Sequence, residues 1–251
     1  MPTLIGVPMK LFPILIVLAL AASWANAERG PVEEPWVEPS RELEELGFDV
    51  STESLLEIIE STETTQAQEL AIRIVGLRGE QESAPILRRL MVAAPGEAIR
   101  HRSAVALARL GDEAGLAELR RLCYTDHHRR FSFAMELASL GDPTCLSMVL
   151  EAAGSTDTLV QRRAIGAVSE FYPLVSDVDR RRLRGFLEQM LDHESRSLRW
   201  IALGEARTTF SRWRLDLEEF QSMLSRYSDK EQDPELKAMA LRALESWKDF
   251  E

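Results

Sequence analysis

A short pattern that recurs along the chain is the feature that most constrains its fold. Each copy has an aliphatic residue, a basic or amide anchor residue, two variable positions and a small residue, followed by apolar residues at helical spacing. The copy at Arg130 departs from this pattern. The anchors are Gln68, Arg100, Arg130, Gln161, Arg199 and Lys237, spaced 32, 30, 31, 38 and 38 residues apart. Such a period predicts a stack of repeated helical units.

Glycine residues mark the end of the first helix in the early units. Gly79, Gly111 and Gly141 each follow their anchor by eleven residues, and Asp142-Pro143 then opens a second amphipathic run. A glycine that ends one helix and an Asp-Pro pair that starts the next are typical of a tight helical hairpin. Neither helix can bury its apolar face alone, so stacked hairpins bury a continuous core. The sequence therefore predicts an all-α fold, an α-solenoid of about six helical hairpins.

One stretch of the chain resembles a known repeat. His101–Leu122, which reads HRSAVALARLGDEAGLAELRRL, is similar to the HEAT-like repeat of the phycobilisome-lyase type, among the armadillo-like families. The shared features are a basic residue, a run of alanines, a leucine-glycine stop and a second helix with spaced leucines. The resemblance covers about residues 51–251 and is strongest at 98–150. It implies an α-solenoid and, for the lyase members, action on cytoplasmic phycobiliproteins.

The first 27 residues have the pattern of a cleaved secretory signal. Lys10 is the only charged residue before Glu28, and it directly precedes an apolar run that ends in Ala25-Asn26-Ala27. A short positive region, an apolar stretch and an A-x-A site predict cleavage after Ala27, with Ala25 and Ala27 as the site residues. We therefore expect an exported protein, periplasmic or extracellular. The alternative is a membrane-anchored structural protein held by an uncleaved helix, although the run is shorter than the ~20 apolar residues that span a bilayer.

The net charge of -11 is concentrated near the N-terminus. Residues 28–66 carry twelve acidic and two basic side chains, a net of -10, whereas residues 67–251 have a net of -2. Prolines among the acids predict an extended linker at 28–40. A helical pattern then predicts N-terminal capping helices at 41–66, ahead of the solenoid at 67–251. Because a nucleic-acid-binding protein has a basic footprint, no nucleic-acid partner is expected.

The histidines and cysteines predict neither a metal site nor a disulfide. His127 and His193 lie two repeats apart, which is ~20 Å at the usual spacing of packed helices and far beyond a ~2 Å ligand bond. Cys123 is expected at the end of one second helix and Cys145 at the start of the next. An eight-residue offset between parallel helices would place their Cα atoms ~15 Å apart, against a limit of ~7 Å for a disulfide. We expect two free thiols, no bound metal and no cofactor.

The longer later units contain the residues most typical of a binding surface. Arg181 and Arg184 belong to a run of arginines, and Arg212 precedes Trp213 in the same region. Arginine can bind a carboxylate or phosphate through two hydrogen bonds, and arginine beside aromatic residues is common at interface centres. We predict that these four residues contact a protein partner. Two alternatives are a solvated helix face whose arginines pair with neighbouring acids, and aromatic residues that fill the core of a larger hairpin.

Motifs that would indicate catalysis do not occur in the sequence. It has no nucleophile elbow, phosphate loop, zinc-protease helix or paired-cysteine motif. We therefore expect a non-enzymatic scaffold or adaptor that binds a protein along its helical face and contacts a membrane only if the signal segment is retained. A lyase-like enzyme or enzyme subunit is the remaining alternative. The export signal argues against it, because the lyases of the resembling family act on cytoplasmic proteins.

Overall fold

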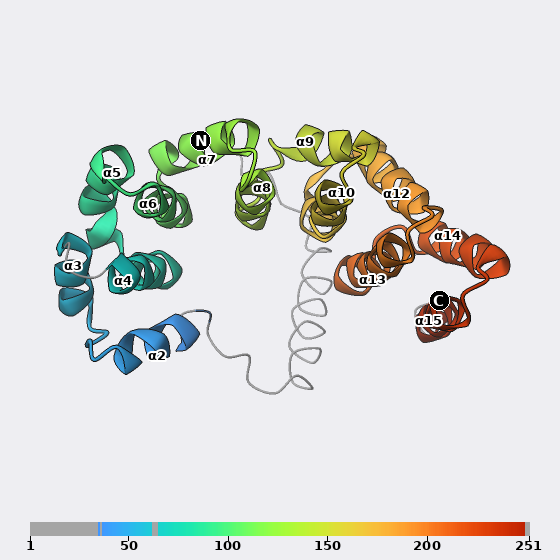
Figure 1. Ribbon diagram of the computed structural model, residues 1–251, viewed down its shortest axis with the longest axis horizontal. Helices are drawn as coiled ribbons and strands as arrows, with labels where there is room; N and C mark the ends of the chain where they lie inside the picture. Colours follow the sequence, from blue (N-terminus) through green and yellow to red (C-terminus); the bar gives the residue numbers. More distant parts are fainter. Residues whose placement is uncertain (1–34, 36, 62–64, 249–251) are drawn as a thin grey trace, which may run out of the picture.

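The computed structural model describes residues 35, 37–61 and 65–248. Within this part of the chain every regular element is a helix, and the helices form two layers along an open arc (Figure 1). The all-α solenoid expected from the repeats is thus confirmed. The predicted signal peptide, residues 1–27 with Ala25 and Ala27, lies outside the described residues. No helix of the described segments combines the length and apolar character needed to cross a bilayer.

The inner layer of the arc consists of the anchor-bearing helices, which are seen end on in Figure 1. They are α4 (Thr65–Arg78), α6 (Glu97–Arg109), α8 (Arg130–Ser139), α10 (Thr158–Ile165) followed by α11 (Val168–Phe171), α13 (Arg196–Trp213) and α15 (Pro234–Trp247). The outer helices lie along the arc. They are α3 (Thr52–Glu60), α5 (Ala84–Ala93), α7 (Glu113–Thr125), α9 (Leu146–Glu151), α12 (Asp177–Leu191) and α14 (Leu217–Lys230). Short 3-10 turns stand at Gln81–Ser83, Ala152–Gly154 and Tyr172–Leu174.

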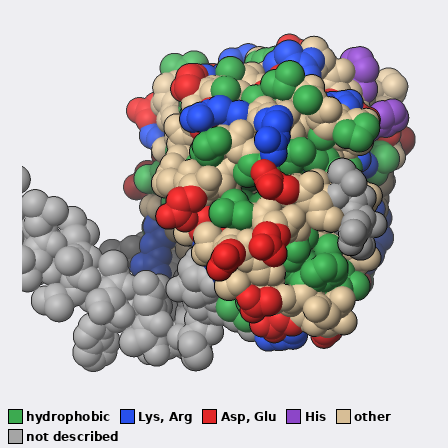
Figure 2. Space-filling model, turned by 90° about the vertical axis from the view of Figure 1, so that its left-hand side faces the viewer, with side chains coloured by type: hydrophobic (Ala, Val, Ile, Leu, Met, Phe, Trp, Pro, Cys, Tyr) green, Lys and Arg blue, Asp and Glu red, His purple; other side chains and the backbone are tan. Residues whose placement is uncertain are grey.

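The N-terminal end of the arc is made by α2 (Val37–Glu45), which packs against α4, and by α3. α2 begins inside the range 28–40 where an extended linker was expected. Pro39 is compatible with this helix because it lies in the first turn, where backbone N–H groups have no helical acceptor. Figure 2 views this end of the molecule and shows acidic side chains over its middle and lower part, with Lys and Arg side chains mainly toward the top.

Three of the six anchor residues, Gln68, Arg100 and Arg199, hydrogen-bond the backbone that precedes their own helix. Gln68 donates its side-chain amide to the carbonyl oxygen of Ile59 at 2.8 Å. Arg100 donates to the carbonyl oxygens of Ala94 and Pro95, 2.8 and 3.2 Å away. These carbonyls lie at or just past the end of an outer helix, where no helical N–H is available to them. A long donor side chain at this position therefore fixes the turn between two units.

The glycines at the ends of the early inner helices adopt the left-handed conformation that their position requires. The backbone φ angles of Gly79, Gly111 and Gly141 are 73°, 77° and 85°. At the second of these turns the N–H of Asp112 donates to the carbonyl of Leu107 at 2.9 Å, which is the Schellman pattern of a helix end. The predicted glycine stops are confirmed.

Small residues allow the helices of one unit to approach closely. The buried apolar side chains form two clusters that meet at α6, where Ala104 and Ala108 belong to one cluster and Ala106 and Leu107 to the other. Gly115 of α7 lies so close to α6 that a Cβ atom on it would be 2.5 Å from the backbone nitrogen of Ala108. The core therefore extends along the arc as two clusters that adjoin at α6.

The expectation that the two cysteines are free was wrong. Cys123 and Cys145 form a disulfide, with Cα atoms 6.4 Å apart. The ~15 Å estimate assumed that successive outer helices lie side by side and parallel. Instead they follow one another along the arc, so that the last turn of α7 meets the start of α9 (Figure 1). The ion pair between Arg120 and Asp142, at 2.7 Å, joins the same two helix ends.

Candidate partner-binding groove

An open cavity of about 610 Å³ lies on the inner layer, between α4, α6 and the start of α8. Its floor includes the apolar side chains of Val105 and Phe133. Charged side chains from three consecutive repeats surround this floor. They are Glu69, Arg73, Arg102, Arg109, Arg129 and Glu136. We call this surface the concave groove.

Helical spacing explains why α6 contributes most of the groove. Arg102, Val105 and Arg109 follow one another at intervals of three and four residues, which places them on one stripe of the helix. The opposite side of α6 carries Ala104 and Leu107, which are completely buried. One face of α6 therefore packs in the core, and the opposite face lines the groove.

Two ion pairs tie neighbouring helices together across the groove. Arg109 of α6 makes two hydrogen bonds with Glu136 of α8, at 2.5 and 3.1 Å. Arg102 lies 3.7 Å from Glu69 of α4, and about half of its side chain (52%) is exposed. In the Arg109–Glu136 pair, two guanidinium nitrogens each donate to one carboxylate oxygen. The Arg102–Glu69 pair is longer and more exposed to solvent.

His101 lies at the edge of the groove and positions Arg129. Its Nδ1 is 3.2 Å from Nη1 of Arg129, and its ring contacts the ring of Phe133 edge-on at 5.1 Å. Burial lowers the pKa of His101, although the carboxylate of Glu97 acts in the opposite direction. A neutral imidazole fits this geometry, because Nδ1 can then accept the hydrogen bond from the guanidinium.

Glu97, His101 and Asp126 bring possible metal-ligand atoms within 4.8 Å of one another. Two features favour a hydrogen-bond network here. The guanidinium of Arg129 already faces the imidazole, and its positive charge would repel a cation. Asp126 also accepts hydrogen bonds from the backbone N–H groups of His128 and Arg129, at 3.0 and 2.9 Å. That no metal binds stays a prediction.

Arg181 and Arg184 line a second cavity of about 420 Å³ between α12 and α14, on the outer layer. Arg181 is exposed there. Arg184 forms an ion pair with Asp216 and donates to the hydroxyl of Tyr172 at 2.6 Å. Asp216 has a left-handed φ of 56°, so this network holds the unusual turn between α13 and α14. The side chain of Arg184 therefore stabilises the turn between α13 and α14 of its own chain.

Arg212 and Trp213 lie together at the end of α13. The guanidinium of Arg212 lies over the indole ring, 4.7 Å from its centroid, and also pairs with Glu170. The indole N–H of Trp213 donates to the carbonyl of Ser169 at 2.7 Å. The structure thus brings the four predicted contact residues together as two separate pairs. Their role in partner binding stays a prediction.

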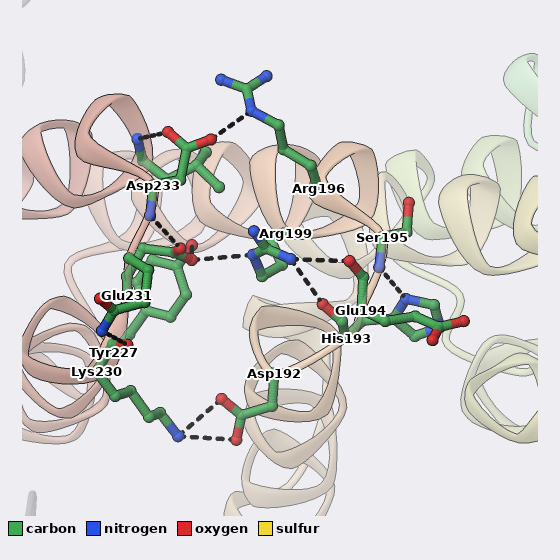
Figure 3. Close-up of polar contacts among 12 residues, drawn as sticks. Asp192, His193, Glu194, Ser195, Arg196, Arg199, Tyr227, Lys230, Glu231 and Asp233 are labelled. Atoms are coloured by element: carbon green, nitrogen blue, oxygen red, sulfur yellow. Dashed lines mark hydrogen bonds and ion pairs between the residues drawn. The ribbon is translucent and has the colours of Figure 1, made fainter.

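A third polar cluster joins the loop before α13 to the loop before α15 (Figure 3). Arg199 donates to the carbonyl oxygens of His193 and Glu194 and pairs with the buried carboxylate of Glu231 at 2.9 Å. The hydroxyl of Tyr227 donates to the same carboxylate at 2.5 Å, and burial raises the pKa of this phenol. Because the charged groups neutralise one another, we interpret the cluster as a structural network that holds two neighbouring repeats together.

The concave groove was not predicted from the sequence as a binding site. A signal for part of it was present, since Arg102, Val105 and Arg109 have the spacing of one helical stripe. Arg73 and Arg129, however, belong to other repeats. Only the stacking of α4, α6 and α8 shows that these side chains line the same surface as those of α6.

Comparison with known proteins agrees with the repeat architecture. A family model described as HEAT repeats matches residues 52–134. The solved complex of CpcE and CpcF of phycocyanin lyase from Nostoc sp. PCC7120 is similar with a TM-score of 0.41 and 16% identity, over 98% of this chain and 99% of that chain. No curated protein sequence matches the chain. Residues 52–134 are thus similar to HEAT repeats, and the described part of the chain stacks its helix pairs along an arc.

Proposed function

We propose that this chain is an exported, non-enzymatic scaffold whose concave groove binds a segment of a partner protein. The observation that carries the proposal is the groove itself, an open cavity of about 610 Å³ built by α4, α6 and α8. An apolar floor surrounded by polar and charged side chains has the general composition of a protein-binding surface. Arginine in particular is enriched at such surfaces.

The shape of the groove favours a polypeptide as the ligand. It extends over three consecutive inner helices, and interhelical ion pairs such as Arg109–Glu136 hold those helices in register. A surface that is preformed in this way loses little conformational freedom when it binds. A partner segment could therefore lie across the helices without reorganising the solenoid.

Two observations support export. The first 27 residues have the sequence pattern of a secretory signal. The described part of the chain also contains the Cys123–Cys145 disulfide, and such bonds persist mainly in oxidising compartments outside the cytoplasm. We propose a periplasmic or extracellular location on these grounds.

The test is cell fractionation of the native protein, followed by intact-mass measurement and crosslinking mass spectrometry of what co-purifies. We expect a soluble species that begins at Glu28 and is crosslinked to one stoichiometric partner through α4, α6 and α8. A full-length species in the membrane fraction would favour an anchored structural protein. A soluble species without any partner would contradict the scaffold function. Crosslinks near Arg181 and Arg212 instead would place the contact in the later repeats.

A further inference from the structure

We propose, resting on the scaffold function above, that the ligand of the concave groove is an extended acidic segment of the partner protein. The structure further indicates the spacing of the acidic residues, at about every third position of that segment. Three features of the groove carry this inference: its continuity, its excess of arginine over glutamate side chains, and the origin of its arginines in three consecutive repeats.

The groove continues toward the N-terminal end of the arc. A neighbouring cavity of about 420 Å³ is lined by Glu42 of α2 and shares three lining residues with the groove. The shared residues are Glu69, Arg73 and Arg102. A polypeptide could therefore cross α4, α6 and α8 in one path. Such a path suits an extended chain better than a compact ligand.

The charges of the groove favour a ligand with carboxylates. Four arginines line the groove against Glu69 and Glu136, the neighbouring cavity adds Glu42, and burial lowers the pKa of His101. Arg109 is fully engaged by Glu136. Among the described residues, neither Arg73 nor Arg129 has a carboxylate within ion-pair distance. Arg129 contacts the imidazole of His101, and, against the opposing effect of burial, its charge also lowers the pKa of Asp126 from farther away. Two guanidinium groups are thus available to a ligand, one at each end of the groove.

The spacing of the helices sets the spacing expected in the ligand. Neighbouring packed helices lie about 8–10 Å apart. An extended chain advances about 3.3 Å per residue, so it crosses one helix spacing in roughly three residues. Arg73, Arg102 and Arg129 come from three consecutive repeats. Carboxylates at about every third residue would therefore reach Arg73 and Arg129 at the two ends, with the half-exposed Arg102, 3.7 Å from Glu69, between them.

The chain has an acidic segment of its own, which is a poorer match to this spacing. Residues 28–40 contain acids at 28, 33, 34 and 38, separated by five, one and four residues. Glu38 is also part of α2, so its backbone is helical and not extended. We therefore assign the groove to a segment of a partner protein.

The experiment measures binding of labelled peptides to the full native protein by fluorescence anisotropy at low ionic strength. The probe is a peptide of four Glu-Gly-Ser units. The comparison peptides replace every Glu with Gln, or place the same four Glu residues side by side. We expect the Gln peptide to bind at least about tenfold more weakly and added salt to weaken the Glu peptide, because salt screens charge attraction. The peptide with four adjacent Glu residues should also bind more weakly than the peptide of four Glu-Gly-Ser units.

The variants are Arg73→Gln and Arg129→Gln, with Arg89→Gln, at an exposed arginine of outer helix α5, as the matched control. Each groove variant should weaken binding of the spaced Glu peptide by about tenfold, whereas the control should change it by less than about twofold. Arg73 has no hydrogen bond or ion pair to a described residue, so Arg73→Gln should fold normally. Its melting temperature serves as the check.

Several outcomes would overturn the proposal. Equal binding of the Gln and Glu peptides would show that carboxylates are not recognised, and tighter binding of a peptide of residues 28–40 would make the chain's own segment the occupant. If no Glu peptide binds but crosslinks of a native partner map to α4, α6 and α8, the scaffold function stands and the acidic ligand is wrong. If neither a peptide nor a partner binds, both proposals fail.

Discussion

Cys123, in the last turn of α7, is bonded to Cys145 at the start of α9, and the bond joins two consecutive repeats at the middle of the arc. Both side chains are completely buried. The bond closes a loop of 22 residues that contains all of α8. It therefore limits how far these two repeats can separate when the chain unfolds.

Removing this bond should destabilise the protein. For a loop of this length the double substitution Cys123→Ala and Cys145→Ala should lower the free energy of unfolding by about 3 kcal/mol. Chemical denaturation of the variant measures the loss, with reduced wild-type protein as the control that keeps both sulfurs. Reduction should also add the mass of two hydrogens to the native protein. A native mass that does not change on reduction would contradict the disulfide.

Gly115 tests the close contact between α6 and α7. The substitution Gly115→Ala forces a Cβ atom against the backbone of Ala108, so it should cost about 1–3 kcal/mol of stability. The matched control is Gly185→Ala in α12, where no atom lies within 4 Å of the added Cβ. That control should be neutral or gain up to about 1 kcal/mol, because alanine favours a helix interior over glycine. Equal effects of the two substitutions would rule out the proposed close contact.

Glu205 should make stability depend on pH. Burial raises the pKa of this carboxyl from its usual 4.5, although it accepts a hydrogen bond from the N–H of Ser169 at 2.7 Å. A raised folded-state pKa contributes stability below the unfolded value, and this contribution is lost as pH rises. Glu205→Gln should therefore raise the melting temperature at pH above 7, with the gain shrinking toward pH 4.5.

The control for Glu205 is Glu151→Gln, a change at an exposed glutamate. It should leave the pH dependence of the melting temperature as in the wild type. A Glu205→Gln variant that is less stable than wild type at neutral pH would show that the charged carboxylate is favourable at this site.

His101 should have the opposite pH dependence. Burial lowers its pKa from 6.5, so the folded chain favours the neutral imidazole. The stability that it contributes is present above pH 6.5 and is lost as pH falls below that value. His101→Gln should therefore reduce the fall in melting temperature on acidification, whereas His127→Gln at an exposed neighbouring position should not. Identical pH profiles for wild type and His101→Gln would contradict this account.

The repeat architecture could be predicted from the sequence because its signals are local. The anchors and the glycines that end the early inner helices each occupy fixed positions within one unit. Gly111 needs a left-handed φ and Arg100 needs a carbonyl within reach, and both requirements are met by residues that are near one another in the sequence. Such signals are independent of the arrangement of distant repeats.

The disulfide and the groove depend on that arrangement, so the sequence alone did not reveal them. The distance between Cys123 and Cys145 follows from outer helices that succeed one another along the arc. Likewise, Arg184 and Arg212 have the residue types of a binding surface, yet both are engaged by acids of their own chain, Asp216 and Glu170. The sequence contains these acids but does not show which arginine each one meets.

The most direct test of the central claim, that the concave groove is the partner-binding surface, is site-specific photo-crosslinking in the native cell. A photoreactive residue is placed at position 105, on the floor of the groove, or at position 178, which is exposed on outer helix α12. We predict a protein adduct from position 105 and none from position 178. An adduct from position 178 together with none from position 105 would contradict the account.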